Sequence, residues 1–216
     1  MKSGWKRLAR SERQMARKAG NQQMRPLFLV VCEDAKAAPA YFGALRTHLR
    51  LSTAIVEICG QECGSAPISV VDYAIRRRQE HRENGRAVDV VFCVVDVDAH
   101  SSLLAALDKA RAHALHGVVS SPSFELWFLL HFVNGGRSYA DHNALLRDLK
   151  KHLPGYSKGS FAAFDCLWNK THAAIQRARS LVSLRGDDRL RNPSTEVHFV
   201  VEAFIAQSQV SLVDIG

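Results

Sequence analysis

The apolar run from Val90 to Val95 places the strongest constraint on the fold, because two acids, Asp96 and Asp98, follow it closely. A continuous run of β-branched and apolar residues is typical of a strand that a parallel sheet buries on both faces. Side chains alternate along a strand, so both acids can point to one side at its carboxyl end, where α/β sheets bind ligands. Close carboxylates repel unless a cation lies between them, and their oxygens suit Mg²⁺ or Mn²⁺. A loop acid or a helix cap is the alternative explanation.

A second strand repeats this arrangement. Residues 27–32 are apolar and end at Glu33, and a helix is expected to begin near Lys36. If the two strands are neighbours in one parallel sheet, Glu33 lies at the same edge as Asp96 and Asp98. Three converging acids favour a metal site, in which the aspartates bind the ion and Glu33 serves as ligand or general base. We therefore predict that the three carboxylates lie within a few ångströms of one another.

The order of the expected elements indicates an α/β fold, with a parallel sheet flanked by helices and a helical C-terminal half. Strands are predicted at 27–32, 53–59, 88–95 and 117–120. Helices are predicted at about 37–50, 67–83, 101–115, 122–133, 141–152, 165–184 and 194–208. These elements divide the chain into a basic tail (1–25), an α/β core (26–121) and a helical portion packed on that core (122–216).

The composition indicates a protein with a sizeable core and no membrane partner. Of the 216 residues, 47% are hydrophobic, and no apolar run is long enough to span a bilayer. No signal-peptide pattern follows the first residue. The five cysteines are an odd number, and Cys59 and Cys63 lack the second pair that a zinc site needs. Reduced cysteines and a cytoplasmic location are therefore expected, and the formation of a homo-oligomer stays open.

Most of the net charge of +8 lies in residues 1–25, which contain eight basic residues and the single acid Glu12. This segment lacks the apolar periodicity of a core element, so a flexible arm is expected. Arg7 and Arg10 are our candidates for contacts with nucleic-acid phosphates, which would make binding depend on salt. A solubilising tail is the alternative.

A second basic cluster lies near the end of the helix predicted at 67–83. Cations at a helix C-terminus interact favourably with the helix dipole, and this structural explanation is slightly preferred over a functional one. The cluster consists of Arg76, Arg77, Arg78, Arg82 and Arg86.

The predicted helix 122–133 carries one acid, Glu125, although the helix is apolar on every side. Ser121 is expected to cap this helix and Pro122 to occupy its first position. A buried carboxylate must be paired, neutralised or bound to a metal. Glu125 is therefore either the partner of a buried Arg or Lys, or a member of the metal shell. His131 is expected to be a core histidine rather than a ligand.

The segment 192–198 is expected to open the last helix, with Asn192 as the cap and Pro193 in its first position. The free amides of a helix N-terminus attract anions, so polar side chains there can hold a phosphate, although capping alone also explains them. Lys36 can likewise bind a phosphate, or it is an exposed lysine in the first turn of its helix. The candidates at the last helix are Ser194, Thr195 and His198.

Four motifs, in their order along the chain, resemble the RloB-like family of Toprim-domain proteins. They are Val31-Cys-Glu33-x-x-Lys36-x-x-Pro39-x-Tyr41-Phe42, Val95-Asp96-Val-Asp98, Ser121-Pro-Ser-Phe-Glu125-Leu-Trp127-Phe-Leu-Leu130-His131-Phe132 and Asn192-Pro-Ser194-Thr195-x-Val-His198. The resemblance covers nearly the whole chain after residue 25. It implies a Toprim-like fold and a Mg²⁺- or Mn²⁺-dependent nuclease that cleaves DNA or RNA. It also implies a role as an antiphage or abortive-infection effector, with an ATPase encoded nearby as a partner.

One position departs from the family's pattern. These proteins usually have Gly directly after the motif glutamate, and this chain has Asp34. The extra acid either joins the metal shell or makes the turn less permissive and weakens activity. A non-catalytic nucleic-acid-binding or sensor subunit of a defence complex is therefore the alternative function.

Overall fold

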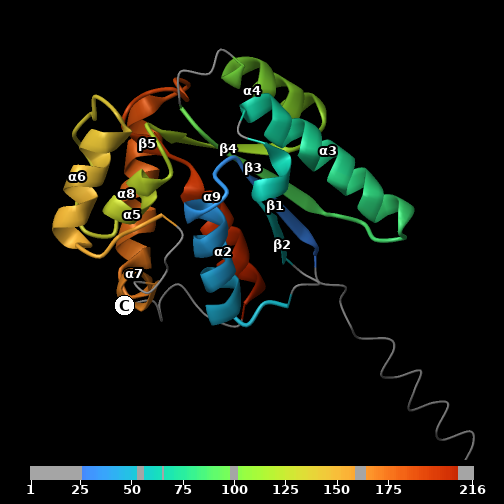
Figure 1. Ribbon diagram of the computed structural model, residues 1–216, viewed down its shortest axis with the longest axis horizontal. Coiled ribbons are helices and arrows are strands. Elements are labelled where there is room, and N and C mark those ends of the chain that lie inside the picture. The colour runs from blue at the N-terminus through green and yellow to red at the C-terminus, as the bar shows by residue number, and fades with distance from the viewer. Residues whose placement is uncertain (1–25, 53–55, 65, 98–101, 159–163, 209–216) are drawn as a thin grey trace, which may run out of the picture.

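A sheet of five strands, in the order β2-β1-β3-β4-β5, forms the centre of the computed structural model (Figure 1). The structure describes residues 26–52, 56–64, 66–97, 102–158 and 164–208. Four strands are mutually parallel, namely β1 (Phe28–Cys32), β2 (Val56–Cys59), β3 (Val90–Asp96) and β4 (His116–Ser121). The edge strand β5 (Ser194–Thr195) runs antiparallel to β4. The α/β fold is as predicted, but the sheet carries an antiparallel edge strand that the sequence did not indicate.

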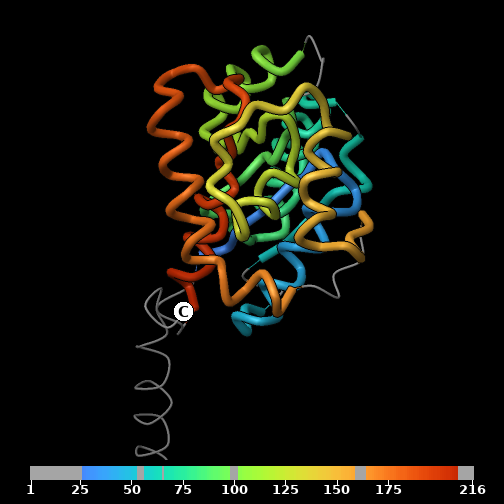
Figure 2. Tube along the Cα trace, turned by 90° about the vertical axis from the view of Figure 1, so that its left-hand side faces the viewer, coloured from blue at the N-terminus to red at the C-terminus, as the bar shows by residue number. Residues whose placement is uncertain are grey.

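Helices cover both faces of this sheet (Figure 1). One face packs against α3 and α4 through Leu29 and Val31, and the other packs against α2 and α9 through Phe28 and Val30. The alternation of side chains along the strands separates these two cores. The helices α6 and α8 lie on the side that faces the viewer in Figure 2. The helices are α2 (Ala37–His48), α3 (Pro67–Glu83), α4 (Leu103–Ala112), α5 (Glu125–Leu129), α6 (His142–His152), α7 (Phe164–Trp168), α8 (Thr171–Arg185) and α9 (Val197–Gln207), with a 3₁₀ turn, η1 (Gln61–Cys63).

Several predicted elements are confirmed, and the helix predicted at 67–83 has the bounds of α3. The five cysteines are free thiols. Within the described residues, no helix combines the length and the apolar character needed to cross a bilayer. The tail 1–25, with Arg7 and Arg10, lies outside the described residues.

The C-terminal half differs most from the prediction. The helix predicted at 165–184 is divided into α7 and α8, and the one predicted at 122–133 is reduced to the short α5. The helix predicted from residue 194 begins at Val197, because Ser194 and Thr195 pair with the end of β4. One sheet therefore includes residues from both the predicted core (26–121) and the predicted helical portion (122–216).

Glu196 fastens this C-terminal half to the sheet through buried interactions. Its carboxylate makes ion pairs with Arg185 and Arg189 and accepts a hydrogen bond from the Val119 amide at 2.9 Å. The side chains of Glu196 and Arg185 are each only 6% exposed. Arg189 also donates a hydrogen bond to the Gly117 carbonyl at 2.7 Å. Removing the carboxylate would therefore leave a buried guanidinium without its counter-charge, which is costly.

We predict that Glu196→Ala lowers the free energy of unfolding by about 3–5 kcal/mol, because it leaves the Arg185 charge buried and unpaired. Urea denaturation of the wild type and the variant measures this loss. The matched control is Glu202→Ala on α9, which removes an ion pair with the half-exposed Arg179. That pair is expected to contribute about 1 kcal/mol or less. Equal losses in the two variants would contradict the role assigned to Glu196.

Candidate functional site

The carboxyl ends of β1 and β3 form the point at which the chain connections diverge. The two strands are parallel neighbours, yet β1 leads to α2 on one face of the sheet and β3 leads towards α4 on the other. In open α/β sheets such a switch point opens a crevice at the carboxyl edge, and ligands bind there. Glu33 follows β1 directly, and Asp96 is the last residue of β3. The structure therefore brings these two acids to one edge, as the prediction required.

Glu33 and Asp96 are connected through the backbone. The Asp96 amide donates a hydrogen bond to Glu33 Oε2 at 3.1 Å, and the Glu33 amide donates one to the Val94 carbonyl at 2.9 Å. Both acidic residues are half-buried. Asp98, the third acid of the predicted metal site, lies outside the described residues. The predicted distance between all three carboxylates thus stays a prediction.

The charges of these acids act on residues from both sides of the edge. Burial, followed by the charges of Glu62 and Glu33, raises the pKa of Cys63 to about 11. Asp34 and Asp96 instead act on two residues beyond α6, Tyr156 and Lys158. Glu33 thus lies close enough to Cys63, and Asp34 and Asp96 lie close enough to Lys158, for their charges to act on these residues. Within the described residues, no group of three or more His, Cys, Asp or Glu side chains is arranged to hold a metal ion.

Asp34 caps the start of α2. Its carboxylate accepts hydrogen bonds from the amides of Lys36, Ala37 and Ala38, three of the donors that a helix leaves unpaired at its N-terminus. Its φ angle is outside the left-handed range, since only Arg50 and Ala114 have positive φ among the described non-glycine residues. An aspartate in place of the family's usual glycine therefore does not strain this turn. It supplies a cap that glycine cannot.

Gly60, directly after β2, allows the turn between β1 and α2 to pack closely against the end of β2. A Cβ atom at Gly60 would be 2.6 Å from Pro39 Cγ and 3.2 Å from the Asp34 carbonyl oxygen. Real side chains do not approach so closely, so the site requires glycine at this position. A glycine at the carboxyl end of a predicted strand is the sequence signal that identifies such a position.

Glu125 is buried, with 1% of its side chain exposed, and both of its oxygens are occupied. Oε2 accepts a hydrogen bond from Ser123 Oγ at 2.8 Å and lies 3.5 Å from His142 Nδ1. Oε1 accepts one from the Tyr156 hydroxyl at 3.1 Å and lies 3.4 Å from Lys158 Nζ. Of the two roles that the sequence left open, the structure shows the paired carboxylate. Glu125 anchors the segment after α6, and its place in the metal shell stays a prediction.

Lys158 brings a positive charge to the acidic side of the edge. Burial lowers its pKa, but attraction to Glu125, Asp34 and Asp96 outweighs burial, so the pKa of Lys158 is raised. The pKa of Tyr156 is also raised, by burial and then by the same three acids. Neither residue was predicted from the sequence, because only tertiary packing brings them to the sheet. The predicted phosphate ligand Lys36 is exposed at the start of α2.

The segment 192–198 lies at the same edge of the sheet. Contrary to the prediction, Asn192 does not cap a helix there. Asn192 bonds to the backbone of Tyr139 in both directions, with its Oδ1 accepting from the amide and its Nδ2 donating to the carbonyl. Thr195 Oγ1 lies 2.8 Å from Ser120 Oγ, and Ser120 is the register partner of Asp96. The candidates Ser194, Thr195 and His198 are all buried, at 1%, 0% and 1% exposure. The prediction of Asn192 as a cap was wrong, because β-pairing recruits Ser194 and Thr195.

The cap predicted for the other helix was also wrong. Ser121 is the last residue of β4, and its hydroxyl donates to the Leu190 carbonyl at 3.1 Å. The helix α5 begins only at Glu125. Because β4 pairs with β3 and β5, it continues as a strand through Ser121, where the sequence pattern favoured the start of a helix.

His131 is a core histidine, as predicted. Its side chain is buried, its Nδ1 lies 2.9 Å from the Trp127 carbonyl oxygen, and its ring packs edge-on against Trp127. Burial lowers the pKa of His131 to about 4. Between pH 6.5 and 4 the unfolded chain therefore takes up a proton that the folded protein excludes.

We predict that this histidine makes the protein less stable in mild acid. The stability that neutral His131 contributes to the free energy of unfolding is fully present above pH 6.5. About 3 kcal/mol of this free energy is lost as the pH falls to 4. His131→Leu should remove that part of the pH dependence, as measured by urea denaturation at a series of pH values. His152→Leu makes the same chemical change at an exposed position and is the matched control. An unaltered pH profile in His131→Leu would contradict the prediction.

Comparison with protein-family models gives a match over residues 28–204, most of the chain, to a family described as RloB-like protein. The matched region includes every strand of the sheet and both acids at the switch point. Neither the comparison with curated proteins nor the one with solved structures gives a match.

Proposed function

The chain belongs to the RloB-like protein family, and we propose that it is a Mg²⁺-dependent nuclease that hydrolyses phosphodiester bonds of DNA or RNA. The observation that carries this proposal is the position of Glu33 and Asp96 at the switch point of the sheet, joined by the Asp96 amide. Such crevices are the preferred ligand sites of open α/β folds. Acids gathered there are more useful for binding a cation than for stabilising the fold.

The donor set suits Mg²⁺ or Mn²⁺. Magnesium is usually bound through one or two carboxylates, with water and substrate phosphate completing its shell. Glu33 and Asp96 would hold the ion, with Asp98 as the expected third ligand. When bound, the ion would polarise the phosphate and make a coordinated water more acidic. Glu33 is then either a ligand or the general base that removes a proton from the attacking water.

Lys158 is our candidate for the residue that positions the phosphate. Its ammonium group has three donors, and the ion pair with Glu125 leaves part of this capacity for another anion. The side chain is 41% exposed, so a phosphate approaching Asp96 can reach it. Glu125, Tyr156 and Ser123 hold the lysine on this side of the edge. Ser194 and Thr195 pair beside β4 and His198 is buried in α9, so these three are not our candidates for phosphate contacts. Arg7 and Arg10 stay candidates for contacts outside the site.

The biological setting is part of the proposal. The RloB-like family is linked to restriction-modification and abortive-infection loci, and this link supports a cytoplasmic antiphage effector that works with an ATPase. A nucleic-acid-binding or sensor subunit without catalytic activity is the alternative that the cleavage test distinguishes.

We predict that the purified protein cleaves plasmid DNA, single-stranded DNA or total RNA in the presence of Mg²⁺ or Mn²⁺ and that EDTA abolishes the cleavage. Asp96→Asn should reduce the rate by about a hundredfold or more, since a metal ion supplies several kcal/mol of charge stabilisation. Glu33→Gln should have a similar effect. Glutamine keeps an oxygen that can accept the Asp96 hydrogen bond, so this variant separates the charge from the structural contact. Gel electrophoresis of timed samples measures the rates.

Asp108→Asn is the matched control, because it makes the same chemical change at an exposed position on α4. It should cleave at the wild-type rate. Activity that persists in Asp96→Asn would exclude the proposed site. Binding of nucleic acid without cleavage under any of the metal conditions would favour the non-catalytic alternative.

We also predict that Lys158, rather than Lys36, positions the substrate. Lys158→Met keeps most of the apolar stem and removes the charge, and it should lower kcat/KM by about tenfold to a hundredfold, as expected for a lost charged hydrogen bond. Lys36→Met should change kcat/KM little. Initial cleavage rates at low substrate concentration measure both, and thermal unfolding checks that Glu125 still anchors the loop. A larger effect of Lys36→Met would reverse the assignment.

A further inference from the structure

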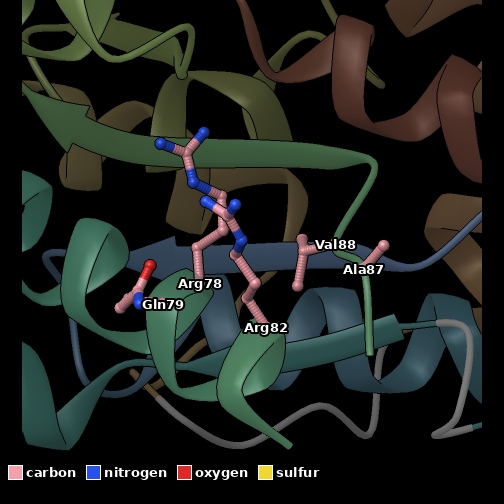
Figure 3. Close-up of a pocket in the computed structure, with 5 residues that line it drawn as sticks. All are labelled: Arg78, Gln79, Arg82, Ala87 and Val88. Carbon is pink, nitrogen blue, oxygen red and sulfur yellow. The ribbon is translucent and has the colours of Figure 1, made fainter. Parts of the chain in front are cut away.

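A pocket lies at the edge of the sheet opposite the candidate site. It is lined by Arg78, Gln79 and Arg82 from the second half of α3 and by Ala87 and Val88, which lead into β3 (Figure 3). Because α3 runs from the carboxyl end of β2 to the amino end of β3, its last turns lie at the amino edge. The pocket is therefore separate from Glu33 and Asp96.

Two guanidinium groups give this pocket its character. Arg78 and Arg82 are four residues apart, so they lie on one face of α3, and both extend in the same direction in Figure 3. One Arg78 nitrogen donates to the His113 carbonyl at 3.0 Å. Within the described chain, neither arginine forms an ion pair and no acid lines the pocket. The nearby Glu83 carboxylate accepts a hydrogen bond from Gln79.

The neighbouring Arg77 differs from the two pocket arginines, because it is paired with acids. Arg77 forms ion pairs with Glu57 and Glu80. The helix dipole accounts for Arg82, which lies in the last turn of α3. It does not account for Arg78, because the effect falls off within one turn of the helix end. Like charges at this spacing also repel each other unless an anion lies between them.

We propose that the pocket of Arg78 and Arg82 binds a backbone phosphate of a polynucleotide, as a contact distinct from the carboxyl edge. Guanidinium groups match the geometry of phosphate oxygens and stay charged at every physiological pH. The inference rests on the proposed function for the nature of the ligand, but it does not require cleavage.

The start of the described chain supports a polymer as the ligand. The Leu27 amide donates to Asp89 Oδ2 at 2.7 Å, and the Asp89 amide donates to the Leu27 carbonyl at 3.0 Å. Asp89 follows Val88 of the pocket, so residues 1–25, with their eight basic residues, are joined to the chain close to this point. The attachment of this basic segment beside the pocket favours a ligand with more than one phosphate over a single free phosphate.

The test is a binding measurement in EDTA, which prevents cleavage. The fluorescence anisotropy of labelled double-stranded DNA and RNA is followed at several NaCl concentrations with Asp96→Asn protein and with the same protein carrying Arg78→Ala or Arg82→Ala. Each arginine variant should flatten the slope of log affinity against log salt by roughly one unit, the value expected for one lost phosphate contact. The double variant should lose roughly two.

Arg76→Ala is the matched control, because it removes the same charge from the same helix outside the pocket, where Arg76 lies over the Tyr73 ring. It should change the slope much less. Arg78→Lys and Arg82→Lys keep the charge and should restore the slope, which guards against a misfolded alanine variant. Equal slopes for Arg76→Ala and the pocket variants would overturn the proposal.

A calorimetric titration with pyrophosphate distinguishes the other source of a phosphate. Pyrophosphate binding that depends on Arg82, together with unchanged slopes for the polynucleotides, would assign the pocket to a small free ligand and overturn the proposal. If the protein does not cleave nucleic acid but its salt slope still depends on Arg78 and Arg82, the phosphate contact stands. Only the catalytic function is then rejected.

Discussion

The handedness of the chain connections is the constraint on which the rest of the structure depends. Connections between parallel strands are right-handed, so the side on which each helix packs follows from the direction in which the next strand is added. From β1 the chain moves outward to β2 and then returns past β1 to β3. Its helices must therefore change faces, with α2 on one side and α3 and α4 on the other. The crevice beside Glu33 and Asp96 is a consequence of this reversal.

The C-terminal half completes this edge by long-range contacts. Pairing of β5 with β4 places Thr195 beside Ser120, and Glu196, the next residue, binds the Val119 amide. The buried carboxylate of Glu125 holds Tyr156 and Lys158 near Asp96. The two buried glutamates thus have different roles. Glu196 fixes the C-terminal helices to the sheet, and Glu125 holds the ammonium group of Lys158 at the candidate site. Both satisfy the requirement that a buried charge be paired.

The sequence predicted what local patterns determine. Apolar runs identified β1 and β3, and the acid at the end of each was placed at the correct edge. The pattern failed where pairing between distant segments decides the conformation. Ser121 and Asn192 both precede proline and look like helix caps, yet strand pairing at Ser121 and side-chain bonds from Asn192 to Tyr139 use these residues otherwise. Lys158 has no local signal, because its place depends on the burial of Glu125, 33 residues earlier in the chain.

The distribution of charge makes the two edges of the sheet complementary. Acids gather at the carboxyl edge, where they would repel a polyanion in the absence of a cation. An enzyme that acts on nucleic acid through such an edge needs contacts elsewhere to hold its substrate, and these contacts must be basic. The contacts proposed for this chain are Arg78 and Arg82 at the opposite edge, neither of which forms an ion pair within the described residues. In the two proposals taken together, affinity for phosphate and chemistry at phosphate are separable, because different edges of one sheet would carry them.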